Sequence, residues 1–271
     1  MLLEVRDAKV AYRRGRKVFE AVRGVSFSLD KGQTLGIVGE SGSGKSTLSK
    51  ALALLLPFSG GSALYEGRDI SAFTRAERAR YRRSVQMVFQ DATGSMNPRM
   101  KVRAALEEVL SVHRPELGRK ERASRIAELL DSTGLASSVL EQYPRELSGG
   151  QCQRASFARA LAAEPSVLIA DEPVSALDVS VQARILNLVR DLRERLGISV
   201  ILVSHDLAVV RNVCDGVCVM HAGLFEESGP AEEVFAHPRT EYTRSLLAAV
   251  PDVARALRAR REEAAAREAR P

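Results

Sequence analysis

The sequence predicts an α/β fold, with an antiparallel β subdomain at its start, a parallel sheet, and a helical subdomain inserted into that sheet. The first 30 residues alternate apolar and polar side chains in two stretches, as half-buried antiparallel strands do. Farther along, short apolar runs alternate with helical runs, which implies parallel strands joined by right-handed crossovers. Between about residues 92 and 163 the apolar spacing is helical and β-branched runs are few, which predicts the helical insertion.

The predicted elements follow in chain order. Alternation predicts antiparallel strands at residues 3–10 and 25–29. Continuous apolar runs predict buried strands at residues 34–38, 85–89, 167–170, 200–204 and 217–220. Helical spacing predicts helices at residues 45–56, 102–112, 119–132, 149–163, 181–196 and 207–213. Residues 251–271 are Arg, Glu and Ala with almost no large apolar side chains, so we expect a charged, solvated tail there.

The composition, 45% hydrophobic and 27% charged, is that of a soluble globular protein. The longest apolar run, residues 51–58, is too short to span a bilayer, and the first residues lack the layout of a secretory signal. We therefore expect a cytoplasmic protein that another protein holds at any membrane it serves. The net charge of +6 comes from basic residues interleaved with acidic ones, which favours an ordinary solvated surface over binding to nucleic acid or anionic lipid.

The three cysteines, Cys152, Cys214 and Cys218, make no disulfide framework. Cys214 and Cys218 flank a short apolar segment, and no further metal ligand of suitable spacing accompanies them. We expect all three to be small buried side chains rather than metal ligands or redox groups.

The segment Gly39-Glu40-Ser41-Gly42-Ser43-Gly44-Lys45-Ser46-Thr47 has a glycine, four residues, and then Gly-Lys-Ser. A buried strand leads in and a helix leads out, which is the context that a phosphate-binding loop requires. The glycines let backbone N–H groups converge on phosphate oxygens, and the helix N-terminus adds partial positive charge. Lys45 is suited to the β- and γ-phosphates, Ser46 to Mg²⁺ and Thr47 to a second phosphate contact. We expect ATP and Mg²⁺ to bind here; a plain Gly/Ser turn is the alternative.

Two carboxylates, Asp171 and Glu172, follow the apolar run 167–170. Open α/β sheets bind ligands at the carboxyl ends of their strands, so both are expected near the phosphate loop. Asp171 is suited to hold Mg²⁺ through water, and Glu172 to orient or deprotonate the attacking water. Adjacent acids also occur as helix N-cap pairs, but the accompanying phosphate loop favours the catalytic interpretation.

The string Leu147-Ser148-Gly149-Gly150-Gln151 resembles the signature motif of ATP-binding cassette (ABC) ATPases. Other motifs of that family occur in the expected order: a glutamine loop at Gln90, a D-loop at Ser175-Ala176-Leu177-Asp178, and a switch histidine at His205. Tyr12 lies where the family places an aromatic that stacks on adenine. The resemblance implies a P-loop NTPase fold of the ABC type over residues 1–250, with its helical subdomain at about 92–163.

The resemblance also assigns roles to these positions. It implies catalytic roles for Lys45, Glu172 and His205, nucleotide contacts from Tyr12 and Gln90 besides the phosphate loop, and Mg²⁺ ligation by Ser46, Gln90 and Asp171.

The signature residues Ser148, Gly149 and Gly150 open a predicted helix, so they offer a hydroxyl, bare N–H groups and a positive helix end to an anion. The family explains this second phosphate cradle: with Gln151, these residues would close on ATP held by the phosphate loop of another subunit. The implied mechanism is dimerisation on ATP, hydrolysis and separation. His205 would contact the γ-phosphate and stabilise developing charge.

Three stretches look like the peptide and nickel importer ATPases within this family, namely residues 88–100 (VFQDATGSMNPRM), 143–147 and 237–247. The likeness implies an ATPase subunit of an oligopeptide, dipeptide or nickel importer at the cytoplasmic face of the cell membrane. Its partners would be a second ATPase subunit, identical or not, two transmembrane permease subunits and, indirectly, an extracytoplasmic solute-binding protein. No cysteine follows Cys218, so we expect no iron–sulfur cluster of the kind some relatives carry.

The same likeness places a contact with the membrane subunit at residues 90 to about 103, where Met96→Asp or Met100→Asp is expected to uncouple hydrolysis from transport. One alternative is a cassette ATPase of a soluble assembly such as the carbon–phosphorus lyase system, which does not usually carry the NPRM string. Another is a nucleic-acid-directed cassette protein, which would carry two cassettes or a long insertion. The sequence favours the importer over both and predicts no nucleic acid partner.

Overall fold

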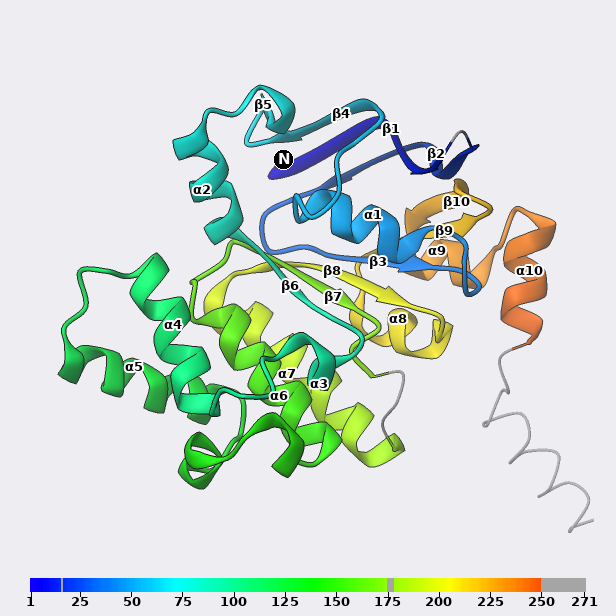
Figure 1. The fold of residues 1–271 in the computed structure, drawn as a ribbon. Coiled ribbons are helices and arrows are strands. Elements are labelled where there is room, and N and C mark those ends of the chain that lie inside the picture. Colours follow the sequence, from blue (N-terminus) through cyan, green and yellow to red (C-terminus); the bar gives the residue numbers. More distant parts are fainter. Residues whose placement is uncertain (16, 175–177, 250–271) are drawn as a thin grey trace, which may run out of the picture.

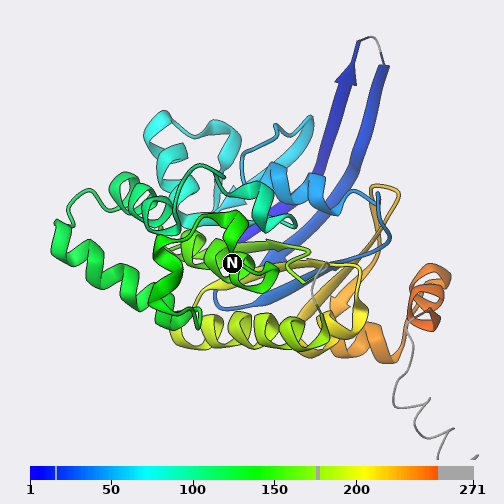
Figure 2. The ribbon, with the colours of Figure 1, turned by 60° about the horizontal axis from the view of Figure 1, so that its bottom comes forward.

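The computed structural model describes residues 1–15, 17–174 and 178–249 (Figure 1). Its first layer is a four-stranded antiparallel sheet in the order β2-β1-β4-β5. The strands are β1 (Leu3–Arg14), β2 (Lys17–Leu29), β4 (Gly60–Tyr65) and β5 (Arg68–Asp69). The β1–β2 hairpin runs past the two predicted strands and projects from the body of the protein (Figure 2). Its outer part is exposed, so no apolar alternation marks it in the sequence.

The second sheet has six strands in the order β10-β9-β3-β8-β7-β6. β6, β7, β8, β3 and β9 pair in parallel, and β10 closes the edge in antiparallel pairing with β9. The central strands are buried on both faces, which explains their unbroken apolar runs. The bounds are β3 (Thr34–Val38), β6 (Val85–Val88), β7 (Val167–Asp171), β8 (Ser199–Ser204), β9 (Gly216–His221) and β10 (Leu224–Pro230).

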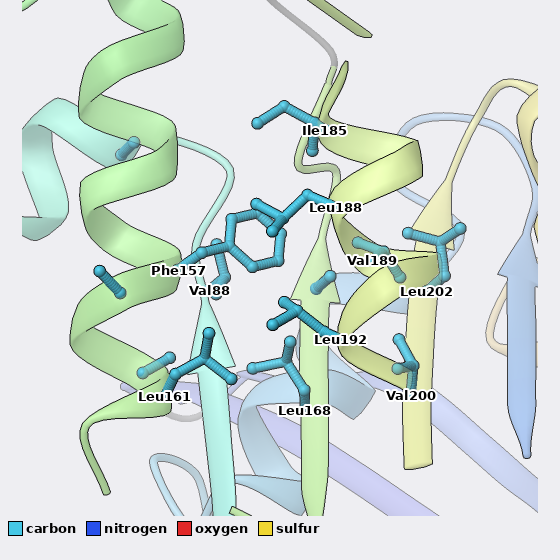
Figure 3. Packing of buried hydrophobic residues seen from close by; sticks show 14 of the residues in the cluster. Val88, Phe157, Leu161, Leu168, Ile185, Leu188, Val189, Leu192, Val200 and Leu202 are labelled. Atoms are coloured by element: carbon cyan, nitrogen blue, oxygen red, sulfur yellow. The ribbon is translucent and has the colours of Figure 1, made fainter. Parts of the chain in front are cut away.

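Successive side chains of these strands enter two different cores. On β7, Val167 and Ile169 belong to a core shared with the antiparallel sheet and α1 (Lys45–Leu52), whereas Leu168 and Ala170 face the helices of the other side. Figure 3 shows the second core, where Phe157 lies among side chains of the sheet and of the neighbouring helix. The α/β fold with an antiparallel β layer, expected from the sequence, is confirmed.

Between β6 and β7 the described elements are all helical, and they lie together at one side of the sheet in Figure 1. They are α3 (Ala92–Ser95), α4 (Val102–His113), α5 (Arg119–Ser132), the 3₁₀ turns Ser137–Glu141 and Pro144–Glu146, and α6 (Gly149–Leu161). This agrees with the helices expected there. The limits of a separate subdomain, residues 92–163, remain a prediction.

The remaining helices are α2 (Arg75–Ser84), with the 3₁₀ turn Ile70–Ala72 before it, α7 (Val179–Leu196), α8 (Leu207–Val213), α9 (Ala231–Ala236) and α10 (Glu241–Ala248). The helix predicted at residues 45–56 ends at Leu52, because Leu54 turns into the left-handed region with φ 56°. Within the described residues, no helix combines the length and apolarity needed to cross a membrane.

All three cysteines are buried and free, as predicted. Burial raises the pKa of each thiol, and that of Cys218 reaches about 12, so these groups stay protonated and unreactive at neutral pH.

Candidate nucleotide-binding site

A cavity of about 650 Å³ lies where the phosphate loop meets the carboxyl ends of the parallel strands. Gln90, Glu172 and His205 follow β6, β7 and β8, and each lines this cavity. The loop between β3 and α1 supplies another wall, and the β1–β2 hairpin supplies the aromatic rim. The structure thus brings together residues that the sequence separates by more than 150 positions, at the edge of the sheet where ligands are expected.

The loop glycines are required by close approach and by backbone conformation. Gly39 and Gly44 have φ values of 151° and 110°. A Cβ on Gly39 would lie 2.0 Å from the Met220 carbonyl oxygen, and one on Gly44 would lie 2.4 Å from that of Ala21. Gly44 is the N-cap of α1 and makes no side-chain cap. The first N–H groups of this helix therefore keep their capacity to bind an anion.

The ammonium of Lys45 is folded into the loop. Its Nζ donates to the carbonyl oxygens of Gly39 (2.8 Å) and Glu40 (2.7 Å) and lies 3.4 Å from the Ser43 hydroxyl. Burial lowers the pKa of Lys45, while the carboxylates of Glu172, Asp171 and Glu40 act in the opposite direction. A buried cation with three donors, held by two carbonyl groups of the same loop, is suited to exchange one of them for a phosphate oxygen.

Ser46 and Asp171 form the second pair. The Ser46 hydroxyl donates to Asp171 Oδ1 at 2.9 Å, and Asp171 is buried. Burial raises the pKa of Asp171, and the hydrogen bond from Ser46 partly offsets it. Within the described residues no three His, Cys, Asp or Glu side chains cluster as a metal cage. One hydroxyl and one carboxylate fit Mg²⁺, which keeps several waters and takes its remaining ligands from phosphates.

Glu172, which follows β7, faces two groups across the cavity. Its Oε2 accepts a hydrogen bond from Gln90 Nε2 at 2.9 Å and lies 3.2 Å from His205 Nδ1. The backbone of Glu172 is left-handed, with φ 46°, and its N–H donates to the carbonyl oxygen of Val203 on β8. The side-chain amide of Gln90 is thus directed at the carboxylate of Glu172, so Mg²⁺ ligation by Gln90, expected from the resemblance, remains a prediction.

Two aromatic side chains stand at the rim. Tyr12 on β1 pairs across the hairpin with Phe19 on β2, and both are exposed and line the cavity. The Tyr12 hydroxyl lies 3.2 Å from the Thr47 hydroxyl, so the ring stands next to the end of the phosphate loop. Paired exposed aromatic rings are suited to stack on a flat base. The sequence indicated Tyr12 and missed Phe19, which only the register of a longer hairpin would have revealed.

The signature residues lie elsewhere, at the start of α6. Ser148 is the N-cap: its hydroxyl accepts from the N–H of Gln151 (3.3 Å), and its own N–H donates to Gln151 Oε1 (2.9 Å). A Cβ on Gly150 would lie 2.6 Å from Val181, so this glycine lets α6 pack closely on α7. Gly149 opens the helix between them. None of these four residues lines the cavity formed by the phosphate loop.

Two further expectations meet the structure here. Residues 175–177 of the D-loop lie outside the described residues, and Asp178 caps α7 by accepting from the N–H of Val181 at 3.0 Å.

Met96 is only 2% exposed and belongs to the core between the parallel sheet and the helices, and Met100 packs against the same core. Met96 was therefore a wrong choice of contact residue, since an aspartate there would disturb the core. The neighbouring Arg99 is exposed.

The family model described as "ABC transporter" matches residues 22–175. The oligopeptide transport ATP-binding protein OppF of Salmonella typhimurium is 42% identical over 260 residues, covering 93% of this chain and 78% of OppF. OppD of Bacillus subtilis is 45% identical over 258 residues, covering 92% and 72%.

Among solved structures, a dimeric bacterial ABC transporter cassette, MJ0796, superposes with a TM-score of 0.77 at 27% identity, over 85% of this chain and 99% of that one. The same cassette is known as a dimer in a post-hydrolysis state bound to ADP and Pi, with a TM-score of 0.76 at 28% identity over the same shares of the two chains. By sequence and by fold, this chain belongs to the ATP-binding subunits of the ABC transporter family.

Proposed function

We propose that this chain is the ATP-hydrolysing subunit of an importer for oligopeptides, and that it drives transport by closing on ATP together with a second ATPase subunit. One observation supports hydrolysis: a single cavity is lined or adjoined by Lys45, by Ser46 paired with Asp171, and by Glu172 paired with His205. The chain matches relatives named for oligopeptide transport over most of their length, and these names support oligopeptides as the cargo. The same names favour import over a role in a soluble assembly.

ATP enters with its base against Tyr12 and Phe19 and its phosphates over the N-terminus of α1. Lys45 then exchanges a loop carbonyl for a phosphate oxygen. Ser46 and Asp171, with Gln90 in the same cavity, would hold Mg²⁺, which when bound would neutralise charge on the phosphates. Stacking on the aromatic rim adds affinity with little selectivity among bases.

Glu172 orients the attacking water and accepts its proton, because its carboxylate lines the same cavity as the phosphate loop. His205 contacts the γ-phosphate and stabilises the charge that develops there. The hydrogen bond from Gln90 to Glu172 links this carboxylate to the segment after β6 that leads into the helical insertion. Gln90 is therefore suited to report the state of the membrane subunit to the site.

The cavity is half of a complete site. Ser148, Gly149, Gly150 and Gln151 of another ATPase subunit, identical or not, close over the ATP. Two transmembrane permease subunits bind the helical insertion, and they hold the chain at the cytoplasmic face of the membrane. A solute-binding protein outside the cell delivers the peptide.

Glu172→Gln tests the catalytic assignment. The variant keeps the hydrogen bonds of the site but removes the base, so hydrolysis falls by a factor on the order of 100 to 10,000 while ATP binding is retained. The measurement is phosphate release by the assembled transporter, alongside ATP binding to the same preparation.

Glu116→Gln is the matched control, since Glu116 is exposed and pairs with Arg114 in the helical insertion. It is expected to hydrolyse ATP at the wild-type rate. Wild-type hydrolysis by Glu172→Gln would remove Glu172 from the catalytic role.

A further inference from the structure

The C-terminal helix α10 contacts the phosphate loop. The N–H of Glu40, the second residue of that loop, donates to the hydroxyl of Tyr242 at 3.3 Å, although 202 positions separate the two residues. The Tyr242 ring stacks on His221 at the end of β9, with centroids 4.1 Å apart and planes 22° apart. Figure 1 shows α10 beside the edge of the sheet formed by β9 and β10. Tyr242 does not line the nucleotide cavity, so any effect it has must pass through the loop.

The end of β9 also contacts the loop directly. The Met220 carbonyl oxygen occupies the space that a Cβ on Gly39 would need. In the turn after β9, the N–H of Gly223 donates to the Ser43 carbonyl oxygen at 2.9 Å. The end of β9, the β9–β10 turn and Tyr242 thus support the part of the loop that precedes α1.

Tyr242 is itself held in place by a buried carboxylate. Glu227 on β10, 8% exposed, accepts from the N–H groups of Arg239 (3.0 Å) and Thr240 (3.3 Å) just before α10. Burial alone would raise the pKa of Glu227, but these hydrogen bonds hold it below its usual value. Thr240 caps α10 by accepting from the N–H of Thr243 at 3.1 Å. These bonds hold the start of α10 in place, and Tyr242 lies in its first turn.

Glu40 is the point through which this support reaches the nucleotide. Its N–H is bonded to Tyr242, and the Gly39 carbonyl oxygen of the same peptide group accepts from Lys45 Nζ at 2.8 Å. Lys45 can leave that carbonyl for a phosphate oxygen when ATP binds, whereas the bond to Tyr242 does not compete with phosphate. The Tyr242 hydroxyl therefore keeps the orientation of this peptide group in both states, and it reduces the freedom the loop would lose on binding.

We propose that Tyr242 is a positioning residue of the phosphate loop, so that α10 sets the affinity of the site for ATP. The inference rests on the proposed function, since it concerns the same nucleotide. Tyr242 does not line the nucleotide cavity, so it acts on binding through the loop and leaves the chemical step unchanged.

The test compares Tyr242→Phe with the wild-type full chain. This change removes the hydroxyl and keeps the ring that stacks on His221. Equilibrium titration with Mg²⁺-ATP is expected to give a Kd about 2- to 5-fold larger, as for the loss of one neutral hydrogen bond. In the assembled transporter, KM for ATP rises by the same factor and kcat stays within experimental error.

Tyr65→Phe is the matched control, because it removes the hydroxyl of a tyrosine that contacts Tyr81 under the antiparallel sheet, outside the nucleotide cavity. Its Kd is expected to equal that of the wild type. The melting temperature without nucleotide should fall for Tyr242→Phe by no more than the loss of one neutral hydrogen bond explains, since the ring and the packing of α10 are kept.

The outcomes are separable. A wild-type chain that does not bind Mg²⁺-ATP contradicts the proposed function itself. A wild-type chain that binds, together with an equal Kd for Tyr242→Phe, overturns the positioning role alone. A fall in the melting temperature without nucleotide larger than one hydrogen bond explains, or a lower kcat, also overturns it, because either result indicates a structural or a chemical role instead.

Discussion

Two helix N-termini in this chain are built from glycine-rich segments, and they differ in how their first N–H groups are used. α1 begins at Gly44 without a side-chain cap, and the cavity in front of it contains Glu172 and His205. α6 begins at Ser148 with a complete capping box from Gln151, and it lies apart from that cavity. The first N-terminus is open and has Glu172 and His205 in the cavity beside it, whereas the second is capped and its residues 148–151 do not line that cavity. This difference supports the proposal that α6 acts on a nucleotide held by another subunit.

The largest effect is expected at α1. Lys45→Ala removes a buried cation whose partners would be phosphates, so the affinity for Mg²⁺-ATP falls by a factor on the order of 1,000. Equilibrium titration of the full chain measures it. Lys120→Ala, an exposed lysine of α5 outside the cavity, serves as the control and should bind as the wild type does. Retained affinity in Lys45→Ala would contradict the assignment of the loop.

A smaller effect, on hydrolysis alone, is expected at α6. Ser148→Glu places a negative charge where phosphate of a partner's ATP is expected and removes a donor to it, so hydrolysis by the assembled transporter falls on the order of 100-fold. Binding of Mg²⁺-ATP to the isolated chain stays unchanged, because Ser148 is not part of its cavity.

Thr74→Glu is the matched control, since Thr74 and Glu77 form the same capping box at the start of α2. Both variants lose a cap worth about 1 kcal/mol of stability, so a fall in hydrolysis confined to Ser148→Glu cannot come from the cap. Weaker ATP binding by the isolated Ser148→Glu chain would contradict this account, because it would show that α6 contributes to the site of its own chain.

The smallest effect is expected at the surface between β6 and α4. Arg99→Glu reverses an exposed charge in the predicted contact with the membrane subunit, and peptide uptake should fall by about tenfold while ATP binding is unchanged. Arg119→Glu, at the exposed start of α5, provides the control. Normal peptide uptake by Arg99→Glu would contradict the predicted contact with the membrane subunit at this surface.

The sequence predicts the buried parts of the fold well. Residues 34–38 and 207–213 are found with the predicted bounds, since continuous apolar or strongly periodic runs leave one interpretation. α2 was not predicted, because a helix of ten residues that buries only Tyr81 has no apolar periodicity. β10 was not predicted either, because its polar, exposed pattern ends in Gly-Pro at the edge of a sheet.

The residues of the site also fall into two groups, those that the sequence predicts and those that only the structure shows. Local spacing identifies the phosphate loop and the two carboxylates at the carboxyl end of β7. The same spacing cannot show that Tyr242 reaches Glu40, or that Phe19 stands opposite Tyr12, because these contacts depend on how distant elements pack. The prediction for Met96 was wrong for the same reason: its motif indicated a surface contact, and only the packing of the helical insertion shows that Met96 is buried.

The central claim is that α1 of one chain works with α6 of another, and one measurement addresses it directly. Lys45→Ala keeps its α6 intact, and Ser148→Glu keeps its phosphate loop intact, so each variant alone should be nearly inactive in phosphate release. Where the wild-type chain alone hydrolyses ATP, its second subunit is an identical copy, and equal amounts of the two variants then pair at random into dimers. Half of these dimers hold one intact composite site, so the mixture should recover about a quarter of the wild-type rate at the same total concentration. A mixture as inactive as its components, where the wild-type chain hydrolyses ATP, would contradict the account.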